Sequence, residues 1–178
     1  MSRTLVVLRH AKSSYPPGVA DHDRPLGPRG VADAPAAGRW IREHVGIPDH
    51  VVVSSARRTR GTWTLAAPAI GYIGAAGYES SSPGPLTIDP RVYDASAAQL
   101  LEVVRELPDR VRCAVLVGHN PGCEDLVAVL AGDRDAEAAR LIAVKYPTSG
   151  VAVLTHSGSW SALMPGQARL EAFAVPRG

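Results

Sequence analysis

Short runs of apolar residues recur along the chain, and polar residues follow each of them abruptly. Such runs, bounded by turn residues, are typical of strands that are buried on both faces of a parallel sheet. The pattern therefore predicts strands at 4–8, 51–53, 86–88, 113–117 and 151–154, with an additional edge strand at 170–175.

Between these runs, apolar residues recur with the spacing of a helix. Pro28 suits a first helical position, and the helical spacing continues from there to Val45. Pro35 interrupts this pattern, so the helix is expected to be kinked or to begin after Pro28. Further helices are predicted at 57–69, behind a capping box at 96–99 and at 123–130.

Strands that alternate with helices predict an α/β protein with three α/β/α layers and a mostly parallel sheet. The 178 residues contain no internal repeat, and a domain typically has roughly 100–200 residues. We therefore expect residues 1–178 to form a single domain. The segment 71–85 is rich in Gly, Ser and Pro and is expected to be a loose connection, either a lid or a linker.

Charge and composition exclude several classes of protein. The chain has 19 Lys and Arg against 17 Asp and Glu, and a net charge of +2 argues against a strongly basic nucleic-acid binder. The stretches 61–78 and 146–168 lack charged side chains, but Pro, Gly or hydroxyl residues interrupt them, so neither is expected to span a membrane. Cys113 and Cys123 are expected to be reduced thiols. These observations favour a cytoplasmic protein without membrane or nucleic-acid partners.

Three of the predicted strands end in residues that can handle phosphate. Arg9 and His10 follow the first strand, the segment 54–58 with Arg58 follows the second, and His119 follows the strand at 113–117. Ligands of open α/β sheets bind beyond the carboxyl ends of the strands, so these side chains are expected to converge. Arginines suit phosphate oxygens, and an uncharged histidine can be a nucleophile. The sequence therefore predicts phosphoryl transfer in which a histidine accepts the phosphoryl group.

These residues also resemble the motifs of a known family. The segment 8–11, Leu-Arg-His-Ala, resembles the Arg-His-Gly signature of the histidine phosphatase superfamily, which is also called phosphoglycerate-mutase-like. Ser54, Arg58 and Thr62 resemble its second segment, and Gly118-His119 resembles its second-histidine motif. The chain has almost nothing inserted between these elements, which resembles the short phosphohistidine phosphatases of the SixA type. The resemblance implies a minimal phosphoglycerate-mutase-like fold without a large cap insertion.

The resemblance also implies roles for the matching residues. His10 would be the nucleophile that becomes phosphohistidine, and Arg9, Arg58 and His119 would hold the transferred phosphoryl group. The segment 24–30, Arg-Pro-Leu-x-x-x-Gly, resembles the SixA-type segment after the first loop. Several positions depart from the family pattern: Ala11 replaces its glycine, Ser55, Thr59 and Gly61 replace Pro, Ala and Gln, and Gly27 stands where a Thr or Ser cap is usual.

A general acid is harder to find in the sequence. Asp94 is a weak candidate, and Glu124 and Asp125 are weaker ones. An alkoxide leaving group needs a proton, whereas imidazole, with a pKa of about 6.5, can leave neutral from a protonated phosphoimidazole. A site without a dedicated acid therefore favours a protein phosphohistidine as the substrate. A small phosphorylated metabolite is the alternative substrate, and a non-catalytic phosphate-binding module is the alternative from another class.

Other polar residues near these motifs carry weaker signals. Lys12, Ser13 and Arg24 are candidates for contacts with phosphate or its carrier. The segment 21–23, Asp-His-Asp, has metal-ligating residue types, but polar residues in a loop rich in Pro and Gly are usually solvent-facing. Without a metal-binding carboxylate cluster the arginines would supply the charge stabilisation, so we expect no metal and no cofactor. Motifs of cysteine phosphatases, P-loop kinases and serine hydrolases do not occur.

Overall fold

The computed structural model describes residues 1–72 and 86–178. In these residues a seven-stranded sheet has the order β3-β2-β4-β1-β6-β7-β5. The strands are β1 (Ser2–Arg9), β2 (His50–Ser54), β3 (Leu86–Asp89), β4 (Cys113–Gly118), β5 (Ala131–Arg134), β6 (Val151–Ser157) and β7 (Ala168–Ala174). Parallel pairs join β1 to β4, β2 to β3, β2 to β4 and β5 to β7, whereas β6 is antiparallel to both of its neighbours.

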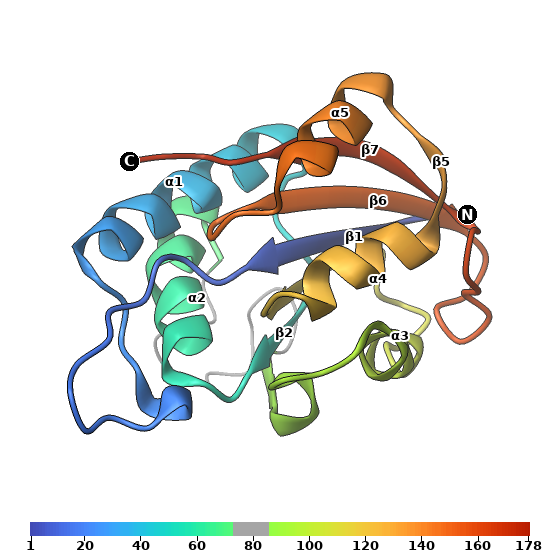
Figure 1. Cartoon of the computed structure of the whole chain (residues 1–178). Helices are drawn as coiled ribbons and strands as arrows, with labels where there is room; N and C mark the ends of the chain where they lie inside the picture. Colours follow the sequence, from blue (N-terminus) through green and yellow to red (C-terminus); the bar gives the residue numbers. More distant parts are fainter. Residues whose placement is uncertain (73–85) are drawn as a thin grey trace.

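Helices cover both faces of this sheet, as the sequence predicts (Figure 1). They are α1 (Pro28–His44), α2 (Arg57–Ile70), α3 (Ala97–Arg105), α4 (Gly122–Leu130) and α5 (Ala136–Val144), with short 3-10 helices η1 (Asp21–Asp23) and η2 (Pro90–Val92). The mostly parallel sheet between two helical layers confirms the predicted α/β class. No helix in the described residues is long and apolar enough to cross a membrane.

Successive side chains of the central strands point to opposite faces of the sheet and pack into two separate hydrophobic cores. Leu5 and Val7 of β1 pack with residues of α3, α4 and α5 on one face of the sheet. Val6 and Leu8 point to the other face and pack with residues of α1 and α2. Because β1 is buried on both faces, its apolar run is continuous rather than alternating. Because this central strand is held on both faces, Arg9 at its end and His10 directly after it are held in fixed positions.

The second half of the sheet differs from the sequence prediction. The strand predicted at 170–175 is β7 (Ala168–Ala174), and it lies between β6 and β5 instead of at the edge. The edge is formed by β5, a strand that the sequence analysis did not predict, and α5 was also missed. Three of the four β5 residues are exposed and only Ala138 of α5 is buried, so neither element carries a strong apolar pattern.

Two further predictions concern the helices and the long connection. The helix expected after Pro28 begins at that residue, and Pro35 lies within it, so the prediction of a later start is wrong. Pro28 occupies the first turn, where the missing N–H costs nothing. The capping box of α3 is confirmed, since Ser96 and Gln99 cap each other. The connection predicted at 71–85 lies outside the described residues from position 73 onward.

Candidate active site

The carboxyl ends of β1, β4 and β2 lie side by side at the same end of the sheet. β1 and β4 are parallel neighbours with Arg9 opposite Gly118, and the backbone N–H of His10 donates to the Gly118 carbonyl at 3.0 Å. β2 lies on the other side of β4, where Val53 is opposite Val117. The residues after β1, β2 and β4 are therefore brought together, as the sequence predicts. The ring centroids of His10 and His119 are 5.2 Å apart.

The His10 ring is fixed in one orientation and one tautomer. Its Nδ1 lies 2.7 Å from the carbonyl oxygen of Ala11. A carbonyl oxygen can only accept a hydrogen bond, so Nδ1 carries the proton and Nε2 keeps its lone pair. The residue is buried, and only 7% of its surface is exposed. The backbone of the next residue thus prepares Nε2 of His10 as a nucleophile.

The His119 ring is held by the serine at the end of β2. Ser54 Oγ lies 2.8 Å from Nε2 of His119, and both side chains are buried. The other ring nitrogen, Nδ1, is buried and has no hydrogen-bond partner among the described residues. A buried polar atom without a partner is uncommon and indicates a contact that a ligand can complete.

Burial and nearby cations keep both rings uncharged. Burial, together with the charges of Arg58, Arg9 and Arg24, lowers the pKa of His10 to about 4, although the bond to Ala11 opposes this shift. Burial, together with His10 and Arg58, lowers the pKa of His119 to about 3. Neutral imidazoles beside arginines are suited to receive an anionic phosphoryl group, because the nucleophile is not already protonated.

Arg9 is anchored by the segment that precedes β6. Its Nη1 donates to the carbonyl oxygen of Tyr146 at 2.7 Å, whereas its Nε is buried without a partner among the described residues. The backbone N–H of Ser149 approaches the carbonyl oxygens of Arg9 and His10 at 3.2 and 3.1 Å. The segment before β6 therefore supports the end of β1, and the other N–H groups of the Arg9 guanidinium have no partner among the described residues.

Arg58 is the buried arginine of the second segment. Its side chain is 8% exposed, whereas Arg57 and Arg60 are exposed residues of the same helix. Arg58 Nη1 donates to the backbone oxygen of Asp21 at 2.6 Å, and Nη2 donates to the Oδ2 atom of that residue at 2.9 Å. Of the three neighbouring arginines, Arg58 is therefore the one that is buried and held by Asp21, and its role in binding phosphate stays a prediction.

Thr62 connects the helix that carries Arg58 to the loop that carries His10. The hydroxyl of Thr62 accepts a hydrogen bond from the backbone N–H of Ala11 at 2.9 Å and donates to the Arg58 carbonyl at 2.7 Å. Both Thr62 and Ala11 are fully buried. The methyl group of Ala11, which replaces the family glycine, is thus accommodated in the packed interior beside the nucleophile.

The three weaker binding candidates lie in the loop after β1. Arg24 donates to the Oγ atom of Ser13 and to the Ser14 carbonyl at 3.1 Å, and its guanidinium lies 3.5 Å from the centre of the Tyr15 ring. Ser13 is buried, whereas Lys12 is exposed. Arg24 adds positive charge near His10, because its charge lowers the pKa of that ring. Ser13 is occupied in holding Arg24.

The acidic candidates differ in their surroundings. Asp94 is exposed and has a left-handed backbone with φ of 54°. It directly follows Tyr93, whose ring meets His119 edge-on with 5.5 Å between the ring centroids. Glu124 accepts a hydrogen bond from Asn120 at 2.8 Å, and Asp125 is exposed on α4. Within the described part of the chain, none of the three forms a hydrogen bond or ion pair with His10 or His119.

Two residues that the sequence analysis did not assign to the site belong to it. Asp21 was expected to face solvent, but its carboxylate contacts Arg24, Arg58 and the Tyr93 hydroxyl. The side chain is 53% exposed, so Asp21 faces solvent as expected while it also makes these three contacts. His22 lies against the Tyr93 ring and is 2.9 Å from Ser55 Oγ. In the sequence, the one feature that could have indicated this role for Asp21 is its acidic side chain, three positions before Arg24.

Metal binding receives no support from the described residues, where no group of three His, Cys, Asp or Glu side chains could hold an ion. Cys113 and Cys123 are free thiols, as expected.

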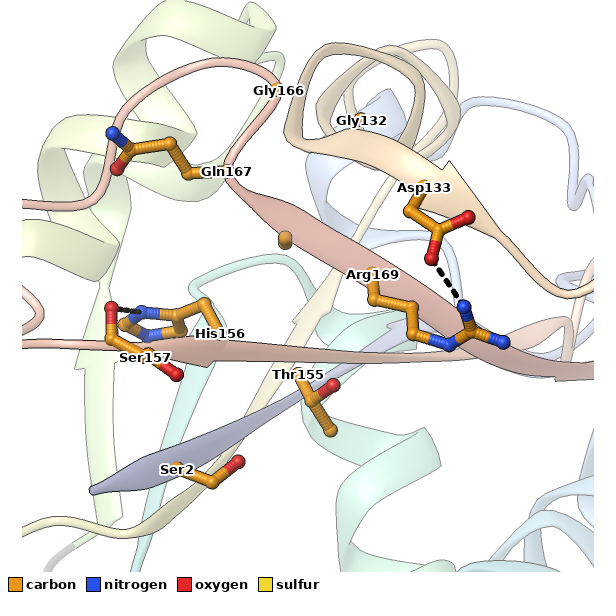
Figure 2. A pocket seen from close by; sticks show the side chains of 10 residues that line it. Ser2, Gly132, Asp133, Thr155, His156, Ser157, Gly166, Gln167 and Arg169 are labelled. Carbon is orange, nitrogen blue, oxygen red and sulfur yellow. Dashed lines mark hydrogen bonds and ion pairs between the residues drawn. The ribbon is translucent and has the colours of Figure 1, made fainter.

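A cavity of about 650 Å³ lies at the opposite end of the sheet from His10 and His119, beside the start of β1 (Figure 2). Its lining includes His156 and Arg169 but none of the residues described above. The Arg169 guanidinium is paired with Asp133 and Glu171. Because its cation is already neutralised, this cavity is a poor site for a phosphate group.

The fold and the site together define an α/β protein that gathers two buried histidines and two arginines at the carboxyl ends of its strands. No family model matches the chain. An uncharacterized protein of Mycobacterium tuberculosis is 40% identical over 172 residues, which cover 96% of this chain and all of that protein. An uncharacterized protein of Mycobacterium leprae is 37% identical over 175 residues, with 96% and 100% covered.

Solved structures show which family this is. A provisionally named phosphohistidine phosphatase SixA from Nakamurella multipartitia is 29% identical, with a TM-score of 0.76 and coverage of 99% of this chain and 97% of that one. Its provisionally named counterpart from Agrobacterium tumefaciens is 26% identical, with a TM-score of 0.76 and 98% of each chain covered. Mycobacterial glucosyl-3-phosphoglycerate phosphatase shares the fold at 18% identity and a TM-score of 0.66, over 97% of this chain and 98% of that one.

The chain belongs to the histidine phosphatase superfamily and is SixA-like. It is accordingly a phosphatase.

Proposed function

We propose that this phosphatase removes phosphoryl groups from phosphohistidine on proteins, through a phosphohistidine intermediate on His10 and without a metal ion. The observation that carries the proposal is the 2.7 Å contact between His10 Nδ1 and the Ala11 carbonyl, which leaves the lone pair of Nε2 free. A site that only bound phosphate would need the arginines but not a nucleophile fixed in this tautomer.

The reaction then has two displacement steps. In the first, the Nε2 lone pair of His10 forms a bond to phosphorus in line with the leaving group, whose bond to phosphorus breaks and whose atom takes the electron pair. In the second, water attacks phosphorus, the bond to Nε2 breaks, and its electron pair returns to the ring. Inorganic phosphate leaves, and the surplus proton passes to solvent. Arg9, Arg58 and His119 hold the phosphoryl oxygens in both steps.

The surroundings of the acidic residues support phosphohistidine as the substrate. Glu124 is bonded to Asn120, and Asp94 is exposed, so no buried carboxylic acid stands beside the two rings among the described residues. Imidazole can leave without such an acid, whereas an alkoxide needs one. Asp94 is the candidate acid if an alkyl phosphate reacts. Arg24, Lys12 and Ser13 are proposed to contact the phosphate or its carrier, either directly or, for Ser13, through Arg24.

The same proposal covers location and partners. We propose a cytoplasmic protein whose residues 1–178 act as one histidine phosphatase domain on a phosphorylated protein, with neither a membrane nor a nucleic acid as a partner. The free thiols of Cys113 and Cys123 suit a reducing compartment. Cell fractionation with a tagged protein tests the location.

The experiment compares phosphate release from a phosphohistidine protein, an aryl phosphate and sugar phosphates, each with EDTA present. We expect the phosphohistidine protein to react fastest and EDTA to have no effect. His10→Ala should abolish turnover and the acid-labile phosphoenzyme, while His44→Ala, at an exposed position of α1, serves as the matched control. Retained turnover or phosphoenzyme in His10→Ala would refute the intermediate. Equal hydrolysis of alkyl phosphates, lost selectively in Asp94→Ala, would refute the substrate assignment.

A further inference from the structure

Asp21 gathers groups from three separate parts of the chain. Its Oδ2 accepts from Arg58 Nη2 at 2.9 Å and from the Tyr93 hydroxyl at 2.8 Å, and its Oδ1 accepts from Arg24 Nη1 at 2.6 Å. We propose that Asp21 is a positioning residue that orients the Arg58 guanidinium for the transferred phosphoryl group. This inference rests on the proposed function, because it assigns Arg58 to the phosphoryl group.

Arg58 has donors left over after it binds Asp21. Two of its N–H groups go to Asp21, one to the backbone oxygen and one to the carboxylate, and a guanidinium has five in a rigid plane. Its charge also acts on both His10 and His119, lowering the pKa of each ring, so the guanidinium lies near the two imidazoles. Asp21 therefore binds one edge of the planar Arg58 guanidinium, and the remaining N–H groups of Arg58 are available for phosphoryl oxygens.

Burial makes this contact different from an ordinary surface ion pair. Exposed pairs contribute little, since both side chains are already solvated by water. Here the Arg58 side chain is 8% exposed and that of Asp21 is 53% exposed. Asp21 is the only carboxylate paired with Arg58 in the part of the chain that the structure describes. A buried cation needs its partner for orientation and for charge balance.

Tyr93 extends the same contact toward the second imidazole. Its hydroxyl bonds to Asp21, and its ring meets the His119 ring edge-on at 5.5 Å between centroids. Asp21 thus restrains Arg58 directly and restrains the ring beside His119 through one hydrogen bond. The carboxylate itself is a poor proton donor, since hydrogen bonds from Tyr93, Arg24 and Arg58 hold its pKa well below the usual value. Asp21 therefore acts by positioning Arg58 and Tyr93, not by donating a proton.

The test compares Asp21→Asn with Asp23→Asn in the same 3-10 helix. Asp23 is exposed, and its side chain contacts only His22 among the described residues. Misplacing a group by about 1 Å can cost about 10²-fold in rate, so we expect Asp21→Asn to lower kcat/KM by about that factor, with Asp23→Asn close to wild type. Tyr93→Phe keeps the ring and removes one hydrogen bond, so it should lower kcat/KM by only about 5-fold.

A double-mutant cycle separates positioning from a general loss of structure. If Asp21 acts through Arg58, then Asp21→Asn should cost almost nothing more in an Arg58→Ala background. The affinity for inorganic phosphate, measured by calorimetry, should fall in Asp21→Asn and be unchanged in Asp23→Asn. The melting temperature of each variant shows whether it folds, and if Asp21→Asn does not fold, Tyr93→Phe serves as the second variant.

Several results would overturn the inference. The inference would be wrong if Asp21→Asn were as active as wild type or more active. That result would mean that the Asp21 carboxylate competes with phosphate for Arg58 and so inhibits the wild-type enzyme. An undiminished loss in the Arg58→Ala background would also overturn the inference, as would an unaffected Tyr93→Phe. A wild-type protein that hydrolyses none of the three phosphate classes would instead contradict the proposed function. The two failures are therefore distinguishable.

Discussion

Ser54 Oγ lies 2.8 Å from Nε2 of His119, and this contact joins the ends of β2 and β4. The same hydroxyl oxygen accepts a hydrogen bond from the backbone N–H of Ala56 at 3.4 Å. When the hydroxyl proton is directed to Nε2, the neutral His119 ring carries its own proton on Nδ1. Nδ1 is then a donor without a protein partner in the described residues, as a phosphoryl oxygen requires.

The first prediction follows from this contact. Ser54→Ala removes the group that sets the tautomer of His119, and a hydrogen bond is worth about 1 kcal/mol, so kcat/KM should fall about 5- to 10-fold. Steady-state kinetics with an aryl phosphate measure the effect. Ser159→Ala, at a position that contacts only Ser161 among the described side chains, is the control. Unchanged kinetics in Ser54→Ala would show that the serine does not control His119.

The second prediction concerns Thr62, whose hydroxyl joins Ala11 to the carbonyl of Arg58. Thr62→Val has nearly the same shape but leaves the buried N–H of Ala11 without an acceptor. Such a loss costs about 1–3 kcal/mol in the free energy of unfolding. Thr62→Ser keeps the hydroxyl and should lose less. Urea denaturation of the three proteins measures both changes, and a Thr62→Val protein as stable as Thr62→Ser would contradict the expectation.

The third prediction concerns Gly30, which packs directly on the loop after His10. A Cβ atom at this position would lie 2.1 Å from the carbonyl oxygen of Lys12, a backbone atom that cannot rotate away. Gly30→Ala should therefore shift the loop, lower the free energy of unfolding by about 1–3 kcal/mol and reduce kcat/KM.

The control is Gly61→Ala in α2, where the nearest atom to a new Cβ is Leu26 Cδ1 at 3.4 Å, the end of a flexible side chain. Alanine is favoured over glycine inside a helix by about 1 kcal/mol, so this variant should be as stable as wild type or more stable. A thermal melt of both variants tests the contrast, and equal destabilisation would show that the loop does not depend on Gly30.

The sequence predicted the central half of the sheet and the convergence of the catalytic candidates, because both depend on strong local signals. Strands buried on both faces are continuous apolar runs, and the residues that end them are fixed at one edge of the sheet. For this reason Arg9, His10, Arg58 and His119 were expected at one end of the sheet, and the structure brings their segments together there. In contrast, β5 is largely exposed at the sheet edge and has no apolar run to predict it.

Asp21 and Tyr93 show what a single sequence does not reveal. They are 72 positions apart and meet through one hydrogen bond between a loop and the segment after η2. Neither belongs to a repeating apolar pattern, and a polar loop residue is solvated in most proteins. Their association depends on how the loop after β1 folds back over α2, which is set by the tertiary contacts of Arg24 and Arg58.

The last prediction concerns the effect of acid on stability. Burial lowers the pKa of His10 to about 4 and that of His119 to about 3, from 6.5 in an unfolded chain. Between pH 6.5 and about 4, the unfolded chain therefore binds a proton on each ring that the folded protein does not bind. Stability rises with pH where the unfolded state holds more protons, so the free energy of unfolding should decrease as the pH falls through this window.

Near pH 5 these two rings contribute a slope of about 2–3 kcal/mol per pH unit to the pH dependence of the free energy of unfolding. A double variant, His10→Gln with His119→Gln, lacks both titrating rings, and urea denaturation at closely spaced pH values should give it a slope near pH 5 that is smaller by that amount. Equal slopes in the two proteins would mean that the rings are protonated in the folded state, and a neutral His10 nucleophile would then be ruled out at these pH values.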